Sequence, residues 1–228
     1  MNETATSSAY RGERRDSNAP PEQAVLPQWT FEAIRPAFRT LSRLLWRMRF
    51  TGVENIPQRG GLLIAANHQT YIDPFWVSIP IKRPLRYLAW DEAFNWPVAG
   101  RLMEWFGAWP LQLEGKDSTP IRRSLHWLRD GGGLMIFPEG GRGLPDGTLA
   151  KFKMGAVRIA LEAGVPILPV TIRGAHRVWP KGQLFPRPAS VEIIYHPLHK
   201  ATLQIGEDAR QCARREINHL TAVIESAL

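Results

Sequence analysis

The stretch GLLIAANHQTYIDP, residues 61–74, joins an apolar run to two side chains that can carry chemistry. Residues 61–67 are mostly apolar, and a run of this length and character predicts a buried strand. His68 follows this strand, and Asp73 stands before Pro74 at the start of a helix-like apolar run. Residues five apart on one helix point about 140° away from each other, so His68 and Asp73 meet only across a turn. The stretch therefore predicts a strand, a turn and a helix, with His68 at the carboxyl end of the strand, where α/β sheets bind ligands.

The remaining chain alternates strand-like and helix-like segments. Further strands are expected in PLRYLAW (84–90), LMIF (134–137), VPILPVTI (165–172) and SVEIIYH (190–196). Helices are expected from Ser118 to the stop signal DGGG (130–133), over 156–163 and over 207–228. This alternation is typical of an α/β protein. We therefore expect a single layered α/β domain over residues 51–228, in which helices flank a mixed, largely parallel sheet.

The composition is that of an ordinary globular protein with a bias in charge. Of the 228 residues, 44% are hydrophobic and 22% are charged, which suits one domain with a proper core. The formal net charge of +8 indicates a negatively charged partner: nucleic acid, an anionic membrane surface or a phosphorylated substrate. The single cysteine, Cys212, excludes an internal disulfide framework and is expected to be an ordinary residue of the last helix.

The first 27 residues are rich in Ser, Asn, Pro, Arg and Glu, which predicts a disordered tail over residues 1–27. They contain no apolar segment of the kind that a secretory signal needs. No run in the chain approaches the ~18 to 20 apolar residues of a membrane-spanning helix. We therefore expect a cytoplasmic protein whose contact with a membrane is peripheral.

An amphipathic helix is predicted directly after the tail, over residues 28–50. Its apolar side chains recur at spacings of three and four residues: Ile34, Phe38, Leu41, Leu45 and Met48. Pro36 marks a start or a kink, and the other side carries basic residues with tryptophans nearby: Arg35, Arg39, Arg43, Arg47, Trp29 and Trp46. Such a helix is typical of a membrane interface, where each arginine contributes ~1 kcal/mol near anionic lipid. The alternative is a helix docked on its own domain with its arginines in water.

A second polar cluster follows another buried strand, in LMIFPEGGRG (134–143). Glu139 and Arg142 lie here on a glycine-rich loop, whose backbone N–H groups and guanidinium can bind a phosphate. The loop lacks the Gly-Lys-Ser/Thr of a Walker A motif, and the chain lacks the G-x-S-x-G of a serine nucleophile. Taken alone, this loop is also explained as a solvated turn with a local salt bridge, and Asp73 as a helix N-cap beside a surface histidine. Taken together, the two clusters predict direct transfer to a hydroxyl group.

Three motifs in the same order carry a resemblance to a known family. NHQTYID (67–73) resembles the N-H-x-x-x-x-D motif of the glycerolipid acyltransferases, the family of 1-acylglycerol-3-phosphate acyltransferases, and FPEGGRG (137–143) resembles their F-P-E-G-T-R-S segment. FKMGAVRIALEAGVPILPVTIRGA (152–175) is similar to a later family segment, in which a helix leads into a V-P-I-x-P-V strand. The resemblance covers roughly residues 50–180.

The resemblance implies an activity. A fatty acyl group would pass from the thioester of coenzyme A or acyl carrier protein to the hydroxyl of a lysophospholipid at a membrane surface, foremost 1-acylglycerol 3-phosphate, which would give phosphatidic acid. His68 would be the general base and Asp73 would orient it. No cofactor is implied beyond the acyl thioester, and the protein would sit peripherally on the cytoplasmic side of a membrane.

The acceptor would be held by residues of the same motifs. By this carry-over Glu139 and Arg142 bind its glycerol phosphate, and Gly140 permits close approach of the backbone. Thr70 stands where the family often has serine, and its hydroxyl is expected to support the loop by a local hydrogen bond.

The chain departs from the family pattern in two places. The middle motif of the family usually ends in a phosphate-binding arginine, where this chain has Gln112, Leu113 and Glu114 and Lys116 as the next cation. Gly141 replaces the threonine of F-P-E-G-T-R. These departures keep two alternatives open, namely an acyltransferase for another lyso-lipid such as a lyso-aminolipid, and a non-catalytic lipid-binding protein.

Two alternative functions, nucleic-acid binding and metal-dependent hydrolysis, do not account for these motifs. Binding of single-stranded nucleic acid would use the basic and aromatic residues but give His68 and Asp73 no task. A metal hydrolase is not indicated, because none of the six histidines falls in an H-E-x-x-H or similar ligand motif. We therefore expect neither a metal nor nucleic acid. A set of aromatics favours an apolar substrate, although each one is also explained by core packing: Trp90, Phe94, Trp96, Trp105, Phe106 and Trp109.

Overall fold

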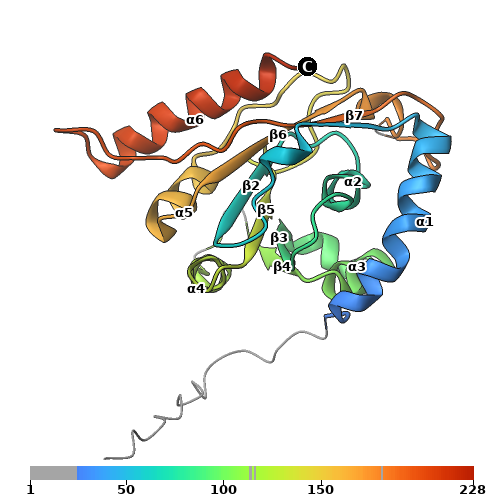
Figure 1. The fold of residues 1–228 in the computed structure, drawn as a ribbon, viewed down its shortest axis with the longest axis horizontal. Helices are drawn as coiled ribbons and strands as arrows, with labels where there is room; N and C mark the ends of the chain where they lie inside the picture. Colours follow the sequence, from blue (N-terminus) through green and yellow to red (C-terminus); the bar gives the residue numbers. More distant parts are fainter. Residues whose placement is uncertain (1–24, 113–114, 116, 181) are drawn as a thin grey trace, which may run out of the picture.

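The computed structural model describes residues 25–112, 115, 117–180 and 182–228. Its strands are β1 (Arg49–Thr51), β2 (Leu62–Ala66), β3 (Leu85–Trp90), β4 (Ala108–Leu111), β5 (Gly133–Ile136), β6 (Ile167–Arg173) and β7 (Glu192–Tyr195). Its α-helices are α1 (Gln28–Trp46), α2 (Asp73–Ser78), α3 (Ala99–Trp105), α4 (Thr119–Arg129), α5 (Gly155–Ala163) and α6 (Ala209–Glu225), and short 3-10 turns are η1 (Val53–Asn55), η2 (Asp91–Asn95) and η3 (Ala175–Arg177). Figure 1 shows these elements in one layered body.

The strands of the described residues form one seven-stranded sheet, in the order β1-β7-β6-β2-β5-β3-β4. Every described neighbouring pair is parallel except β6 and β7, which are antiparallel. The predicted single α/β domain with a mixed, largely parallel sheet is therefore confirmed. From β2 the chain runs to β3 and β4 on one side, returns to β5 between β3 and β2, and then crosses to β6 on the other side of β2. The ends of β5 and β6 thus flank the end of β2, and such a switch point is where open α/β sheets bind ligands.

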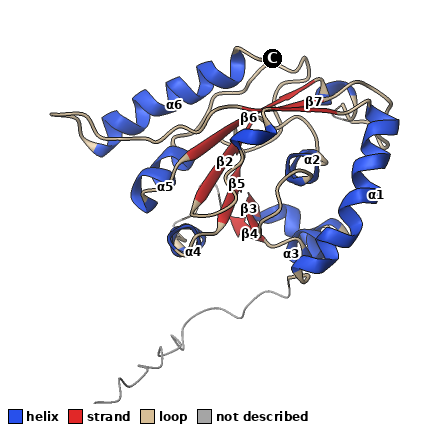
Figure 2. Ribbon diagram, viewed as in Figure 1, coloured by secondary structure: helices blue, strands red, loops and turns tan. Residues whose placement is uncertain are grey.

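Helices cover both faces of this sheet, as Figure 2 shows. One face packs against α4, α5 and α6, and the other against α1 and α2. The strand β2 is buried on both faces of the sheet. Leu63 and Ala65 belong to one core cluster, and Leu62, Ile64 and Ala66 belong to the other. Because side chains alternate along a strand, an unbroken apolar run is what a strand between two helical layers requires.

The helix predicted over 28–50 is real but ends at Trp46, so its predicted end is wrong. Arg47 takes a left-handed conformation with φ of 44°, which stops the helix. Residues 49–51 then pair in parallel with β7, about 140 residues later in the chain. Met48, predicted on the apolar stripe of the helix, is buried in the core after it. The sheet therefore begins two residues before the predicted domain start at residue 51.

The helix α1 docks on the domain through only part of its apolar surface. Trp46 is buried against Trp76, with ring centroids 5.1 Å apart, and Phe38 contacts Phe75. Three members of the predicted stripe stay largely exposed: Ile34, Leu41 and Leu45. Part of α1 is therefore docked on its own domain, and its position in a membrane interface stays a prediction. No helix in the described ranges is long and apolar enough to cross a membrane.

The predicted tail falls mostly outside the described residues, which begin at Val25. Leu26, inside the predicted span 1–27, donates its backbone N–H to the carbonyl of Trp105 at the end of α3 (3.0 Å). The prediction of disorder is therefore too long at this end.

Candidate active site

His68 lies where β2 leaves the sheet. Asn67 holds the chain there, because its side-chain amide pairs with both backbone groups of Ile172 on β6, at 2.9 Å and 2.7 Å. The His68 ring stacks on Phe137 from the end of β5, with centroids 4.2 Å apart, and its side chain is 17% exposed. The predicted position at the carboxyl end of a strand is therefore confirmed.

Asp73 faces His68 across the predicted turn. His68 Nδ1 lies 3.0 Å from Asp73 Oδ2, and the Asp73 side chain has no exposed surface. The same oxygen accepts the backbone N–H groups of Gln69 (2.5 Å) and Thr70 (2.7 Å). Because a carboxylate only accepts hydrogen bonds, this contact places the proton on Nδ1 and leaves Nε2 as the basic nitrogen.

The carboxylate of Asp73 organises the turn and does not cap α2. No side-chain cap bond is made at the start of α2, so the N-cap interpretation of Asp73 is wrong. Asp73 Oδ1 instead accepts the hydroxyl of Thr70 at 2.6 Å. The local hydrogen bond expected of Thr70 is therefore present, and it fixes the carboxylate that in turn fixes His68.

Glu139 supports His68 from the second motif. Its Oε1 accepts the backbone N–H of His68 (2.6 Å) and its Oε2 that of Ala150 (2.8 Å). Burial raises the pKa of the Glu139 carboxyl, and these two hydrogen bonds oppose the rise. The backbone N–H of Gly143 donates to the carbonyl of His68 (2.6 Å), so the two motifs are joined on both sides of His68. Both Glu139 oxygens thus hold protein backbone, and acceptor binding by Glu139 stays a prediction.

The side chain of Lys153 packs against the same loop at Gly140. The φ of +71° at Gly140 suits glycine, and a Cβ at this position would lie 2.8 Å from Lys153 Nζ. The backbone of Lys153 is tied to the loop by its N–H, which donates to Pro138 O (2.8 Å). Lys153 was not predicted as a site residue, although it lies in the family-like segment 152–175. The predicted cation Lys116 lies outside the described residues, and Gln112 is exposed just after β4.

Arg142 lies in an aromatic corner at the mouth of the site. Its guanidinium carbon is 4.1 Å from the centre of the Tyr71 ring, and Nη1 donates to the carbonyl of Trp179 (3.4 Å). The Tyr71 ring makes edge contacts with Trp96 (5.6 Å) and Trp179 (5.7 Å). Cation–π contacts of this type orient a guanidinium.

Gln69 is a second residue that the sequence analysis missed. Its buried amide donates to Gly147 O (3.1 Å) and accepts the backbone N–H of His176 (3.0 Å). These groups line a hollow of about 260 Å³ beside the turn. Gln69 thereby links the turn of His68 to two further loops, and no local pattern in the sequence points to this role.

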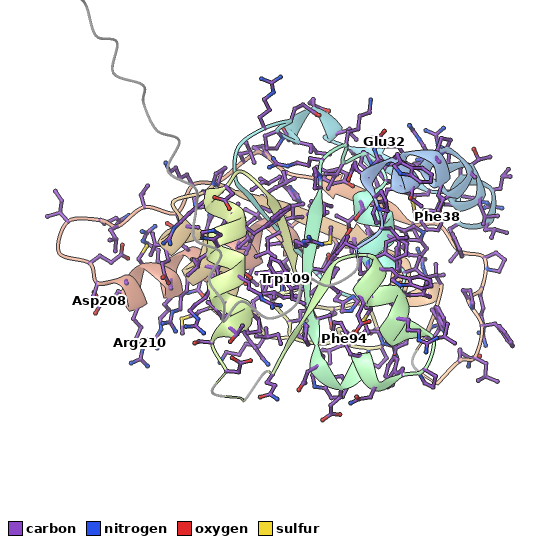
Figure 3. The ribbon with its side chains drawn as sticks, turned by 90° about the horizontal axis from the view of Figure 1, so that it is seen from below. Glu32, Phe38, Phe94, Trp109, Asp208 and Arg210 are labelled. Carbon is purple, nitrogen blue, oxygen red and sulfur yellow. The ribbon has the colours of Figure 1, made fainter. Side chains whose placement is uncertain are left out.

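The aromatic set divides into core and surface. Trp109, a residue of β4, is buried and lies under the guanidinium of Arg86, with 5.7 Å to the ring centre; Figure 3 labels it in the middle of the molecule. Trp90, Trp96 and Trp105 are each more than 40% exposed. Among the described residues, no group of three His, Cys, Asp or Glu side chains is placed to hold a metal ion.

The sequence of the site region matches a family model. The model named "Acyltransferase" matches residues 47–173, which is more than half of the chain and contains all the site residues above except His176 and Trp179. The chain belongs to the acyltransferase family. The predicted resemblance is therefore confirmed at the level of the family.

Individual members of the acyltransferase family resemble the chain over most of its length. A 1-acyl-sn-glycerol-3-phosphate acyltransferase of Pseudomonas aeruginosa is 29% identical, over 76% of this chain and 66% of that protein. The chloroplastic 1-acyl-sn-glycerol-3-phosphate acyltransferase LPAT1 of Arabidopsis thaliana is 27% identical, over 74% of this chain and 51% of that protein. The chain thus spans about half the length of several curated relatives that it matches.

A solved acyltransferase structure shares the fold. The 1-acyl-sn-glycerophosphate (LPA) acyltransferase PlsC of Thermotoga maritima superposes with a TM-score of 0.68, covering 88% of this chain and 81% of that one, at 24% identity. At this identity the likeness establishes the fold.

Proposed function

We propose that the protein transfers a fatty acyl group from an acyl thioester to the hydroxyl of a lysophospholipid, with His68 as general base. The observation that carries the proposal is the contact between His68 Nδ1 and the buried carboxylate of Asp73, because it leaves Nε2 as the basic nitrogen of a side chain that is partly exposed. Membership in the acyltransferase family and the names of the relatives support the same reaction class.

The reaction follows from this geometry. The acceptor hydroxyl gives its proton to His68 Nε2 as its oxygen attacks the thioester carbonyl carbon, and a tetrahedral intermediate forms. The intermediate collapses, the carbon–sulfur bond breaks, and the leaving thiolate takes the proton back from His68. A carboxylate ~4 Å from an imidazolium stabilises it by ~4 kcal/mol at an effective dielectric constant of about 20. General-base assistance contributes ~10² to 10⁴ in rate, so positioning of the two substrates supplies the rest.

We propose 1-acylglycerol 3-phosphate as the acceptor, with phosphatidic acid as the product. Two cations, Arg142 and Lys153, lie on or against the loop that is bonded to His68, where they can bind a phosphate next to the attacking hydroxyl. Gln112, Leu113 and Glu114, in the neighbourhood where the family motif usually ends in an arginine, favour a second candidate, a lyso-lipid without this phosphate such as a lyso-aminolipid. Either coenzyme A or acyl carrier protein can present the thioester, and we propose no further cofactor.

The lipid substrates place the reaction at a membrane surface. The exposed Ile34, Leu41 and Leu45 of α1, beside its arginines, support a peripheral position with α1 in the lipid interface. We propose the cytoplasmic side, where both acyl donors are made.

The test is acyl transfer from a labelled long-chain acyl thioester with vesicles present. Wild type, His68→Ala and the control His126→Ala, an exposed histidine of α4, are offered lysophosphatidate, glycerol 3-phosphate and lyso-aminolipids with each donor. We expect His68→Ala to lose ~10² to 10⁴ of the rate and His126→Ala to keep it. Transfer by His68→Ala at the wild-type rate would remove His68 as the base. A folded, vesicle-bound wild type that acylates nothing would leave a lipid-binding protein.

A second pair of variants separates the two acceptors. Lys153→Met should raise KM for lysophosphatidate about tenfold, because a charge-assisted bond to phosphate is lost, while Lys151→Met, an exposed lysine two residues earlier, should not. If the preferred acceptor is a lyso-aminolipid and Lys153→Met changes no KM, the second candidate replaces the first.

A further inference from the structure

Two segments hold the entire charge bias of the chain. Residues 33–53 contain five arginines and no acidic residue, and residues 174–191 contain three Lys or Arg and again no acidic residue. Together they carry +8, which equals the formal net charge of all 228 residues. The rest of the chain is therefore neutral on balance, and these two segments are strongly basic along the sequence.

The two segments meet at the end of α1. Trp46 Nε1 donates to Arg187 O (3.2 Å), and the Val191 N–H donates to Trp46 O (3.0 Å). Figure 1 shows this orange part of the chain beside the end of α1 that leads into the sheet. The two segments are therefore neighbours in the fold at this point.

The second segment contains an apolar turn that the described residues leave exposed. In the turn of residues 182–187, Leu184 is 84% exposed and Phe185 is 78% exposed. On the neighbouring last turns of α1, Leu44 is 75% exposed. Large apolar side chains in contact with water, framed by arginines without an acidic residue, are typical of surfaces that enter an anionic lipid interface.

The turn is held in shape and connected to the site. Trp179 Nε1 donates to Gln183 O (2.8 Å), and the Arg187 N–H donates to Val178 O (2.7 Å), which closes the turn at its base. Trp179 also contacts Tyr71, and its carbonyl accepts from Arg142. Trp179 therefore connects the turn to Arg142, the proposed phosphate-binding residue.

We infer that the turn of residues 182–187 is a second membrane-docking element, which inserts Leu184 and Phe185 into an anionic bilayer beside the end of α1. This assignment extends the proposed function, on which it rests for the choice of a lipid partner, from α1 to a separate part of the chain. Insertion at this point sets the mouth of the site, at Tyr71 and Arg142, against the lipid that holds the acceptor.

The test compares two pairs of exposed apolar residues. The double variant Leu184→Ser/Phe185→Ser removes the apolar tip. Leu203→Ser/Ile205→Ser is the matched control, because these side chains are 56% exposed or more and precede Asp208, at the opposite end of the molecule from α1; Figure 3 labels Asp208 and Phe38 at these two ends. Binding is measured by cosedimentation with vesicles of equal parts phosphatidylglycerol and phosphatidylcholine, and with phosphatidylcholine alone.

We expect Leu184→Ser/Phe185→Ser to bind the anionic vesicles at least about tenfold more weakly than wild type and the control variant to bind like wild type. Wild type should bind phosphatidylcholine vesicles much more weakly. Equal binding by both double variants, or equal binding of wild type to both kinds of vesicle, overturns the inference. So does sedimentation velocity without lipid, if wild type self-associates through Leu184 and Phe185.

Activity separates this inference from the proposed function. Vesicle binding is measured without turnover, so it stands if wild type binds as expected but acylates no acceptor. With an active enzyme, Leu184→Ser/Phe185→Ser should lose activity on vesicle-borne lysophosphatidate and keep it on a short-chain acceptor dissolved as monomers. A loss on both acceptors assigns the turn to the site itself and overturns a docking role.

Discussion

Glu139 ties the backbone of His68 to that of Ala150 through its two carboxylate oxygens. Its carboxylate accepts the backbone N–H groups of His68 and Ala150, one with each oxygen. In Glu139→Gln one of these N–H groups faces an NH₂, so a buried donor is left without an acceptor. We expect a loss of about 1–3 kcal/mol in the free energy of unfolding and a fall in kcat, measured by urea denaturation and steady-state kinetics.

The control for this prediction is Glu162→Gln, an exposed glutamate of α5, which should change neither quantity. If Glu139 acts only by binding the acceptor, Glu139→Gln raises KM and leaves the stability of the protein unchanged. That result would restore the role that the motif resemblance assigns to Glu139.

At the residue scale the sequence predicts the parts of the site that local spacing defines. The pair of His68 and Asp73 and the bond of Thr70 lie within six residues, so the turn can be read from the chain. The bonds of Gln69 to Gly147 O and to the His176 N–H join residues 78 and 107 positions apart. Such contacts depend on which strands become neighbours, and no local pattern contains that information.

The helix α6 has the clearest start signal among the elements. Asp208 accepts the backbone N–H groups of Arg210 (2.8 Å) and Gln211 (2.7 Å), and the Gln211 side chain accepts the Asp208 N–H (2.9 Å). This capping box satisfies N–H groups that the helix cannot pair itself. Asp208→Ala should therefore cost about 0.5–2 kcal/mol in the free energy of unfolding.

The loss is expected in global unfolding, because α6 buries Ile217, Leu220 and Ile224 in the core. Arg210→Ala, next to the cap on the exposed surface in Figure 3, is the control and should stay within ±0.5 kcal/mol in urea denaturation. An equal cost in both variants would show that the side chain of Asp208 contributes nothing beyond helix propensity.

Elements were predictable where their own residues define them. The strands β2, β3 and β7 fall inside predicted segments, while β5 begins one residue before its predicted segment and β6 ends one residue after its own. β1 and β4 were missed because each is short and at a sheet edge, and β4 even contains Pro110, which an edge strand tolerates. The end of α1 was not predicted either, because residues 49–51 form a strand only by pairing with the distant β7.

At the scale of the whole molecule, alternation of strands and helices was sufficient to predict an α/β domain, but not the strand order. Because β5 and β6 lie on either side of β2, Phe137, His68 and Ile172 come together near the carboxyl ends of these central strands. That arrangement depends on packing of both helical layers, to which every segment contributes.

Two histidines should make the stability of the molecule depend on pH. His176 sits beside Gly147 and Gln69, and burial first and then the charge of Arg177 lower its pKa, against an opposing effect of Asp146. His196 lies with Nε2 2.8 Å from the hydroxyl oxygen of Thr171, and burial lowers its pKa. Because the Thr171 hydroxyl donates to Ile224 O, its oxygen accepts from Nε2–H of a neutral His196.

In the unfolded chain both histidines titrate near the ordinary value of 6.5, and in the folded protein they titrate lower. Between these values the unfolded state binds more protons, so the free energy of unfolding rises with pH and is lost as pH falls. We expect the urea concentration at the unfolding midpoint to decrease when the pH is lowered from about 7.5 to about 5.5. This decrease should be smaller in His176→Gln/His196→Gln. His126→Gln, with a side chain that is 84% exposed, should retain the full dependence. A double variant as pH-dependent as wild type would assign the dependence to other groups, because removing these two histidines removes the only protons that this argument invokes.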